Sequence, residues 1–201
     1  MSKVLEAPRT RVSSEPAILG TVRDPDCNLA IWERAPLDAG ISELAKLECR
    51  IRFTADFAEI PERLDEEISA ACFRGSPARA LLLEDVVRLA GLFVAVMRRN
   101  QLRVRLEHVA TDSCRKFHAD YVPLRLITTY HGAATQWVDK ADAERIAEGL
   151  SPLDIRSMRA GDVGLFKGRL ATRSPAIHRS PPLLDTGQSR LLLVIDPAEE
   201  H

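Results

Sequence analysis

The sequence predicts an α+β protein in which N-terminal helices pack on a C-terminal β-barrel or β-sandwich. Apolar residues recur mainly at helical spacing between residues 41 and 100, and strand-like alternation follows Asn100. Helices followed by strands along one chain are typical of the α+β class. The 201 residues suffice for one domain with its own core. We expect an extended arm over 1–30 and a single domain over 31–201, with a helical part at 36–100 and a barrel part at 101–197.

The predicted helices lie in the N-terminal half. Residues 1–26 are polar and contain three prolines, which favours an extended arm, and a short strand is expected over 27–35. The spacing of apolar residues predicts a first helix over 42–51. Pro61 suits the first turn of a second helix that runs toward residue 72. After a turn at Gly75, Pro77 suits the first turn of a third helix, capped by Ser76, that runs to about residue 100.

The C-terminal half is predicted to consist mainly of strands. Leu102, Val104 and Leu106 alternate with charged residues, which is the pattern of a half-buried strand. Several short strands follow one another in this half of the chain, and such strands form a sandwich or a barrel. A short helix is expected from Ala141 to about Gly149. Further strands are expected over 114–118, 124–130, 162–167, 176–179 and 190–195.

Composition excludes several classes of protein. The 28 basic and 29 acidic residues give a net charge of −1, so no charge surplus favours nucleic acid or anionic lipid. The most apolar stretch, Leu81–Met97, is interrupted by Glu84, Asp85 and Arg88 and is too broken to span a bilayer. Residues 1–20 lack the apolar region of a signal peptide. We therefore expect a soluble, cytoplasmic protein that binds neither nucleic acid nor membrane.

The cysteines are widely spaced and form no CxxC pair. This spacing excludes a classical zinc finger and a short disulfide framework, and it suits reduced thiols. The cysteines are Cys27, Cys49, Cys72 and Cys114.

Two histidines and one aspartate form a candidate metal site. His118 and Asp120 are two residues apart, so on a strand their side chains project from one face. His178, on a later strand of the same predicted barrel, can supply a third ligand. Two histidines and one carboxylate are diagnostic of non-haem Fe(II) oxygenases, because they leave open positions for a co-substrate and dioxygen. Taken alone, the His-Ala-Asp tripeptide fits better a solvated histidine beside a surface aspartate.

Arg190 opens the very apolar strand expected over residues 190–195. An unpaired cation is costly in such a setting, so Arg190 requires an anionic partner. A guanidinium group matches a carboxylate with two parallel hydrogen bonds. Two kinds of partner remain open: a bound ligand, or a structural carboxylate such as Asp162 or Asp196.

Four segments, in this order, resemble the core of the Fe(II)/2-oxoglutarate dioxygenases, a cupin-like superfamily. They are 118–120, 127–135, 160–166, and His178 with Arg190. The resemblance implies that the barrel is a double-stranded β-helix (jelly-roll). It also implies that Fe(II) binds the catalytic residues His118, Asp120 and His178, and that Arg190 binds the far carboxylate of 2-oxoglutarate. Thr128 and Tyr130 are the further cofactor-binding residues expected from it.

Three phrases resemble, more closely, a bacterial family of unknown function. They are Lys-Phe-His-Ala-Asp at 116–120, Thr-Tyr-His-Gly at 129–132 and His-Arg-Ser-Pro-Pro at 178–182. This resemblance covers most of the chain and brings no established activity. It implies, as an alternative, a zinc-linked role.

The sequence departs from the dioxygenase pattern in several places. The turn at 132–135 reads Gly-Ala-Ala-Thr where prolyl-hydroxylase-like members have two glycines. Arg179 directly follows the distal histidine and competes with Arg190 as the carboxylate anchor. Cys114 and His131 add sulfur and nitrogen ligands that suit Zn(II). Their plainer interpretations are a small core residue and a surface turn residue.

Two functional hypotheses follow. The first is an Fe(II)/2-oxoglutarate-dependent oxygenase that acts on a small molecule or a protein. The second is a cupin-like protein that holds Zn(II) or another metal without redox catalysis. The first is favoured, because it gives Arg190 a role that simple metal holding does not.

Overall fold

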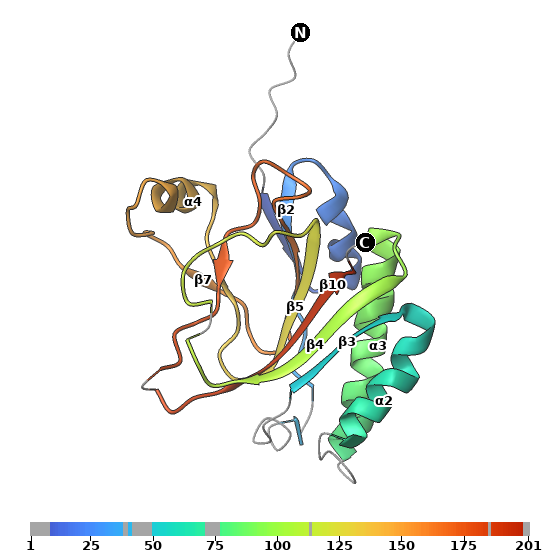
Figure 1. Cartoon of the computed structure of the whole chain (residues 1–201). Helices are drawn as coiled ribbons and strands as arrows, with labels where there is room; N and C mark the ends of the chain where they lie inside the picture. Colours follow the sequence, from blue (N-terminus) through green and yellow to red (C-terminus); the bar gives the residue numbers. More distant parts are fainter. Residues whose placement is uncertain are drawn as a thin grey trace.

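A seven-stranded sheet forms the centre of the computed structural model, which describes residues 9–37, 40–41, 50–70, 77–112, 114–184 and 186–198 (Figure 1). Neighbouring strands in this sheet are antiparallel, except for the two N-terminal strands at one edge, which are parallel to each other. In spatial order the strands are β1 (Arg9–Ser13), β2 (Cys27–Trp32), β8 (Val163–Lys167), β5 (Leu124–His131), β10 (Arg190–Pro197), β4 (Gln101–Val109) and β3 (Arg50–Asp56).

A second, smaller sheet lies on the opposite side of the central sheet from the two long helices (Figure 1). Its strands, in order, are β7 (Arg156–Ser157), β6 (Gln136–Trp137) and β9 (His178–Arg179). Two sheets that face each other in this way give an α+β fold of jelly-roll-like form. The helices are η1 (Pro16–Arg23), η2 (Phe57–Glu59), α2 (Ile60–Ala70), α3 (Pro77–Met97) and α4 (Lys140–Ala147).

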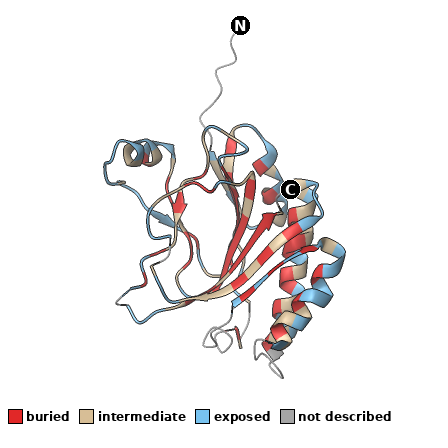
Figure 2. Cartoon of the chain, viewed as in Figure 1, coloured by how far each residue is buried: buried red, intermediate tan, exposed pale blue. Residues whose placement is uncertain are grey.

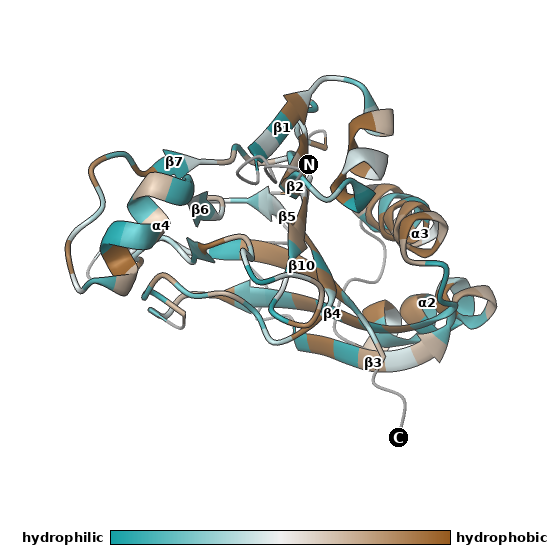
Figure 3. Ribbon diagram, turned by 90° about the horizontal axis from the view of Figure 1, so that it is seen from above, coloured by the Kyte–Doolittle hydropathy of each residue, from teal (hydrophilic) through white to brown (hydrophobic). Residues whose placement is uncertain are grey.

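Strand alternation gives the central sheet two different faces. On β4, Leu102, Val104 and Leu106 are fully buried in the main core, against the helices. Arg105 and Glu107 point to the other face, where the candidate site lies. Figures 2 and 3 show buried, apolar residues concentrated where α3 and α2 cover the sheet.

A second core lies between the central sheet and the smaller sheet. Ile31 and Phe166 from the central sheet pack there against Trp137 of β6. Ile127 and Leu192 belong to this core and also line the cavity of the candidate site. The candidate site therefore lies on the interior face of the central sheet beside this packed region.

Several expected elements are present. The strand that begins at Cys27, the strands expected near 102–106, 124–130, 162–167, 176–179 and 190–195, and the helices near Pro61, Pro77 and Ala141 all form with small differences at their ends. No helix in the described ranges is both long and apolar enough to cross a membrane.

The N-terminal segment differs from the extended arm that the sequence predicts. Within the stretch expected to be extended, residues 9–30, the chain forms β1, η1 and most of β2. Leu19 and Val22 of η1 are buried in the main core. β1 is an outermost strand with no fully buried residue, so it lacks the apolar alternation by which strands are predicted.

The helix expected over 42–51 is wrong at residues 50 and 51, which the structure describes as part of a strand. Ile51 lies in β3, in which Ile51, Phe53 and Ala55 are buried in alternation. The two-residue period continues beyond Ile51 and governs the local structure. Residues 42–49, and the turn and cap expected at Gly75 and Ser76, lie outside the described residues. The helices thus do not precede a purely C-terminal barrel, because β1, β2 and β3 join the central sheet.

The strand expected over 114–118 is replaced by an irregular segment. Cys114 has a left-handed backbone with a φ of 61°, which regular strands do not contain. His118 instead forms one isolated antiparallel bridge, and its partner is His178. This bridge, rather than a regular strand, positions the first histidine.

Candidate metal centre

The isolated bridge brings the two histidines side by side. The His118 N–H donates to the His178 carbonyl at 2.9 Å, and the His178 N–H donates to the His118 carbonyl at 3.0 Å. Residues paired in this way carry their side chains close together. The two imidazole centroids are accordingly 4.8 Å apart.

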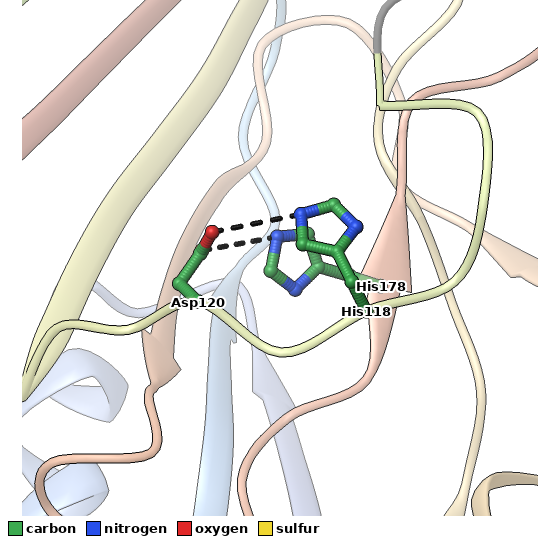
Figure 4. Close-up of side chains that lie close together, drawn as sticks. All are labelled: His118, Asp120 and His178. Carbon is green, nitrogen blue, oxygen red and sulfur yellow. Dashed lines mark ion pairs between the residues drawn. The ribbon is translucent and has the colours of Figure 1, made fainter. Parts of the chain in front are cut away.

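Asp120 completes the cluster. Its Oδ1 lies 3.6 Å from His118 Nε2 and its Oδ2 lies 3.2 Å from His178 Nε2. One ligand atom from each of the three residues lies within 4.8 Å of the others (Figure 4). The predicted convergence of His118, Asp120 and His178 therefore occurs, although 57 residues separate Asp120 from His178 in sequence.

Backbone carbonyls fix the orientation of both rings. His118 Nδ1 is 2.9 Å from the Lys116 carbonyl oxygen, and His178 Nδ1 is 3.3 Å from that of Ala176. A carbonyl oxygen only accepts, so each Nδ1 carries a proton and each Nε2 faces Asp120. A metal would bind the lone pair of a neutral Nε2, and an Nδ1–H held by a carbonyl oxygen is the usual arrangement of metal-binding histidines.

Arg125 holds the carboxylate of Asp120. Its Nη1 donates to Asp120 Oδ1, and its Nε and Nη2 donate to the two oxygens of Asp196 at 2.6 and 2.9 Å. Burial would raise the pKa of Asp120, but the close approach of His118 and His178, with the charge of Arg125, holds that pKa below its usual range. Asp120 is therefore an anion that is oriented toward both imidazoles.

A small cavity of about 120 Å³ joins this cluster to Arg190. It lies on the interior face of β4, β5 and β10 and is bounded on the other side by β9. Its lining includes Cys114, His118, Arg125, Thr135, His178, Arg179 and Arg190.

Arg190 is fully buried and lacks a carboxylate partner among the described residues. Its Nη2 donates to Thr129 Oγ1 at 3.0 Å and to Thr135 Oγ1 at 3.1 Å. Its Nε and Nη1 are buried without a hydrogen-bond partner in the same part of the chain. Burial lowers the pKa of Arg190 to about 10, which leaves the guanidinium charged at neutral pH.

The two structural carboxylates that could have paired with Arg190 are engaged elsewhere. Asp196 accepts a hydrogen bond from Arg125 Nε. Asp162 accepts one from the backbone N–H of Arg159 at 2.7 Å. Neither carboxylate binds Arg190 in an ion pair within the described ranges. The observed environment of Arg190 thus matches the ligand alternative rather than the structural one.

Thr128 and Tyr130 do not reach the cavity, contrary to their predicted cofactor-binding role. On β5 they share the helix-facing side with Leu126. The Tyr130 hydroxyl donates to Asp85 of α3 at 2.9 Å, and burial raises its pKa well above the ordinary value. The residue that faces Arg190 is Thr129, one position away, because side chains alternate between the faces of a strand.

The other residues singled out by sequence have mixed positions. Arg179 lines the cavity but is already engaged, since its Nε donates to Gln136 at 2.7 Å and its guanidinium stacks 4.4 Å above the Phe117 ring. Cys114 lies at the cavity and is exposed, not a core residue. His131 ends β5 and is not part of the cavity lining.

The sequence did not predict the contact of Arg125 with Asp120, nor the contacts of Thr129 and Thr135 with Arg190. The strand alternation of β5 carried a usable signal, because Leu126 and Tyr130 mark the core face and Thr129 the opposite one. Thr135 follows an irregular turn after Gly132, so no periodicity predicted its direction.

The residues present fit a metal ion and a carboxylate ligand. Asp120 Oδ2 is buried without a hydrogen-bond partner among the described residues, although it lies beside two imidazoles. Nitrogen and oxygen donors of this kind suit Fe(II) and Zn(II). The unpartnered N–H groups of Arg190 provide donors for an anion in the same cavity.

Two solved structures with a similar fold contain 2-oxoglutarate, which is also called α-ketoglutarate. One is the dioxygenase for auxin oxidation 1 of Arabidopsis thaliana in complex with 2-oxoglutarate, at 10% identity and a TM-score of 0.52, with 97% of this chain and 93% of that chain covered. Another is a full-length protein of Neurospora crassa in complex with α-ketoglutarate, at 11% identity and a TM-score of 0.51, with coverages of 100% and 88%. At this identity the likeness establishes a shared fold.

The sequence itself places the chain in a family. A search of curated proteins returns no match. The family model described as "Protein of unknown function (DUF1826)" matches residues 13–196, which include every strand of both sheets except the first residues of β1 and the last residue of β10. Because this match covers most of the chain, the protein belongs to the DUF1826 family.

Proposed function

We propose that this protein is a non-haem Fe(II)/2-oxoglutarate-dependent oxygenase. The observation that carries the proposal is the placement of His118, Asp120, His178 and Arg190 around one small cavity. Arg190 brings two unpartnered N–H groups to a buried position, which is costly unless an anion binds there. Fe(II) with 2-oxoglutarate supplies the oxidising chemistry when bound, because two histidines and a carboxylate leave coordination positions open.

Each residue has a distinct task in this proposal. The Nε2 atoms of His118 and His178, together with a carboxylate oxygen of Asp120, hold the metal. Arg125 orients the Asp120 carboxylate and, together with His118 and His178, keeps it charged. Arg190 anchors the far carboxylate of 2-oxoglutarate, and hydrogen bonds to the hydroxyl groups of Thr129 and Thr135 fix its position.

The size and burial of the cavity support a small co-substrate. A volume of about 120 Å³ suits a short dicarboxylate rather than a peptide. The walls of β5 and β10 exclude bulk water around Arg190, so an ionic contact there is stronger than on the surface. The two solved structures with a TM-score above 0.5 cited above are complexes with 2-oxoglutarate, which supports this co-substrate by analogy of fold.

A Zn(II)-holding protein without redox catalysis is the second candidate. The observation that favours it is Cys114, an exposed free thiol that lines the same cavity as His118 and His178. Thiolate and imidazole together favour Zn(II). This alternative leaves Arg190 without a task.

The test uses protein purified without chelator and loaded anaerobically with Fe(II). Addition of 2-oxoglutarate should produce a metal-to-ligand charge-transfer absorption band, and slow uncoupled turnover in air should release succinate. Protein that binds Fe(II) but gives neither signal contradicts the oxygenase proposal. Tight Zn(II) binding that Cys114→Ser weakens, without any effect of 2-oxoglutarate, would support the second candidate instead.

A further inference from the structure

A groove of about 360 Å³ lies beside the candidate metal centre, on the face of β3, β4 and β10 that points away from the helices. We call it the arginine groove. Its lining contains four arginines and one carboxylate. The residues of the arginine groove are Arg52, Phe53, Thr54, Arg103, Arg105, Arg125 and Asp196.

Strand register concentrates the positive charge. Arg52 of β3 is directly opposite Arg105 of β4, and Thr54 is directly opposite Arg103. Like charges that face each other across two strands destabilise the sheet unless something neutralises them. Three guanidinium groups and one hydroxyl therefore occupy adjacent positions on one face.

The nearby carboxylates neutralise only part of this charge. Arg52 Nε donates to Glu107. Asp196 is bound through both oxygens by Arg125 and lies 3.4 Å from Arg105.

Arg103 has no ion pair with any described residue, and Arg105 Nε is buried without a hydrogen-bond partner there. The groove thus keeps donors that an anion can use.

The groove is continuous with the candidate metal centre. Arg105 and Arg125 line both the groove and the cavity that contains His118 and His178. Arg125 also binds Asp120 directly. A molecule anchored in the groove would therefore lie next to the candidate metal centre.

We propose that the arginine groove binds the phosphate group of a small anionic substrate. This inference rests on the proposed oxygenase function, because it assigns the substrate class of that site. A phosphate offers several strong acceptor oxygens, which match Arg52, Arg103, Arg105 and the Thr54 hydroxyl better than one carboxylate does. The limited volume of the groove and the net charge of −1 disfavour a nucleic acid backbone.

Calorimetric titration of the metal-free full chain with inorganic phosphate tests the inference. Matched titrations with sodium chloride at equal ionic strength remove the effect of salt alone. Arg103→Gln and Arg52→Gln should each weaken phosphate binding by roughly tenfold or more, as expected when a charge-assisted hydrogen bond is lost. Arg63→Gln is the matched control, since Arg63 is an exposed residue of α2 and makes the same change in net charge.

The outcomes separate this inference from the proposed function. Phosphate binding that depends on Arg103 and Arg52, with the Fe(II)/2-oxoglutarate absorption band intact in both variants, supports the inference. No phosphate binding in folded wild-type protein, or equal binding in all variants, overturns it. Binding lost only in Arg190→Gln also overturns it, because phosphate then occupies the 2-oxoglutarate anchor. Absence of the absorption band with intact groove binding counts against the oxygenase alone.

Discussion

Arg190 is a buried cation that lowers the stability of the fold unless an anion binds it. Its side chain is fully buried, and only Nη2 has hydrogen-bond partners among the described residues. Burying a charge costs several kcal/mol unless a counter-charge lies nearby, and replacing it with an apolar residue of similar size is often stabilising. A residue with no function at this position would therefore be replaced at no cost to the fold.

Arg190→Met should raise the free energy of unfolding of the metal-free protein by about 1–3 kcal/mol, because it removes an unpaired buried charge. The same substitution should weaken 2-oxoglutarate binding by roughly 2–3 kcal/mol, the loss expected for a charge-assisted pair. Chemical denaturation measures the first effect and anaerobic titration of the Fe(II) protein the second.

Arg190→Lys is the informative comparison, since it keeps the charge but loses the planar fork and should recover only part of the binding. A decrease in stability for Arg190→Met would contradict the interpretation of Arg190 as an unpartnered cation. Loss of 2-oxoglutarate binding in Arg179→Ala but not in Arg190→Met would move the anchor to Arg179.

Among the elements, α3 contributes most visibly to the main core. Six of its residues have no exposed surface: Ala78, Leu82, Val86, Leu89, Ala90 and Phe93. The apolar residues of this helix, which cover most of its circumference, were therefore a sound basis for predicting that it packs on the sheet. Gly91 also allows a close approach, because an added Cβ would come within 3.2 Å of the Phe57 ring.

Leu89→Asp should destabilise the protein by at least about 3 kcal/mol, because an unpaired charge replaces a fully buried side chain. Leu81→Asp is the control on the same helix: Leu81 is 42% exposed, so its substitution should change stability by less than about 1 kcal/mol. Thermal unfolding followed by circular dichroism compares the two. Equal midpoints would show that α3 is peripheral to the cooperative unit.

The loop after α4 depends on one buried carboxylate. Asp142 accepts the backbone N–H groups of Leu153 and Asp154 at 2.7 and 2.8 Å, and these hydrogen bonds lower the pKa of its carboxyl group. The ionised form is thus favoured by folding. Its contribution to stability is complete above the unfolded pKa of about 4 and decreases as the pH falls through the lower folded pKa.

Asp142→Asn should therefore lower the melting temperature at pH 7, and the difference from the wild type should shrink as the pH is reduced below about 4. Asp154→Asn is the control, because Asp154 is an exposed residue of the same loop. Melting curves at several pH values provide the comparison. A constant difference across the pH range would mean that the charge of Asp142 is not what holds the loop.

Elements with a strong apolar period were predictable, and those without one were not. In β4 the alternation of apolar residues determines both the strand and its core face, and in β10 a continuous apolar run determines the strand. β1 has a polar, outermost position, and β6 and β7 have two residues each, too short for any period. Such strands form because neighbouring strands offer them hydrogen bonds, which is a tertiary effect that local sequence does not encode.

At the scale of the whole molecule, the candidate metal centre depends on contacts between distant segments. His118 and Asp120 meet His178 only when β9 has docked against the irregular segment that contains His118. The sequence predicted this convergence through the order of motifs, although its premise of a regular strand at 114–118 was wrong. Thr128 and Tyr130 failed as predictions because a one-residue change on a strand moves a side chain to the opposite face.

A site assembled in this way is absent from the unfolded chain, so a bound metal should stabilise the native state. At a free Fe(II) concentration of about 100 times Kd, anaerobic thermal unfolding should shift upward by roughly 5–10 °C, which corresponds to about 2.7 kcal/mol for a domain of this size. His178→Ala should abolish the shift. His108→Ala should retain it, because His108 lies on β4 outside the cavity lining; loss of the shift in both variants would point to non-specific metal binding.

Arg125 is one cation that serves two carboxylates, Asp120 at the metal centre and Asp196 in the arginine groove. The two sites consequently share an electrostatic component and are not independent. An anion that engages Arg105 alters the charge around Asp196, and through Arg125 it alters the field at Asp120. Thermodynamic reciprocity then requires that metal and anion change each other's affinity by the same factor. Under the two proposals, an anion bound in the arginine groove therefore changes the metal affinity of the candidate centre without touching the metal.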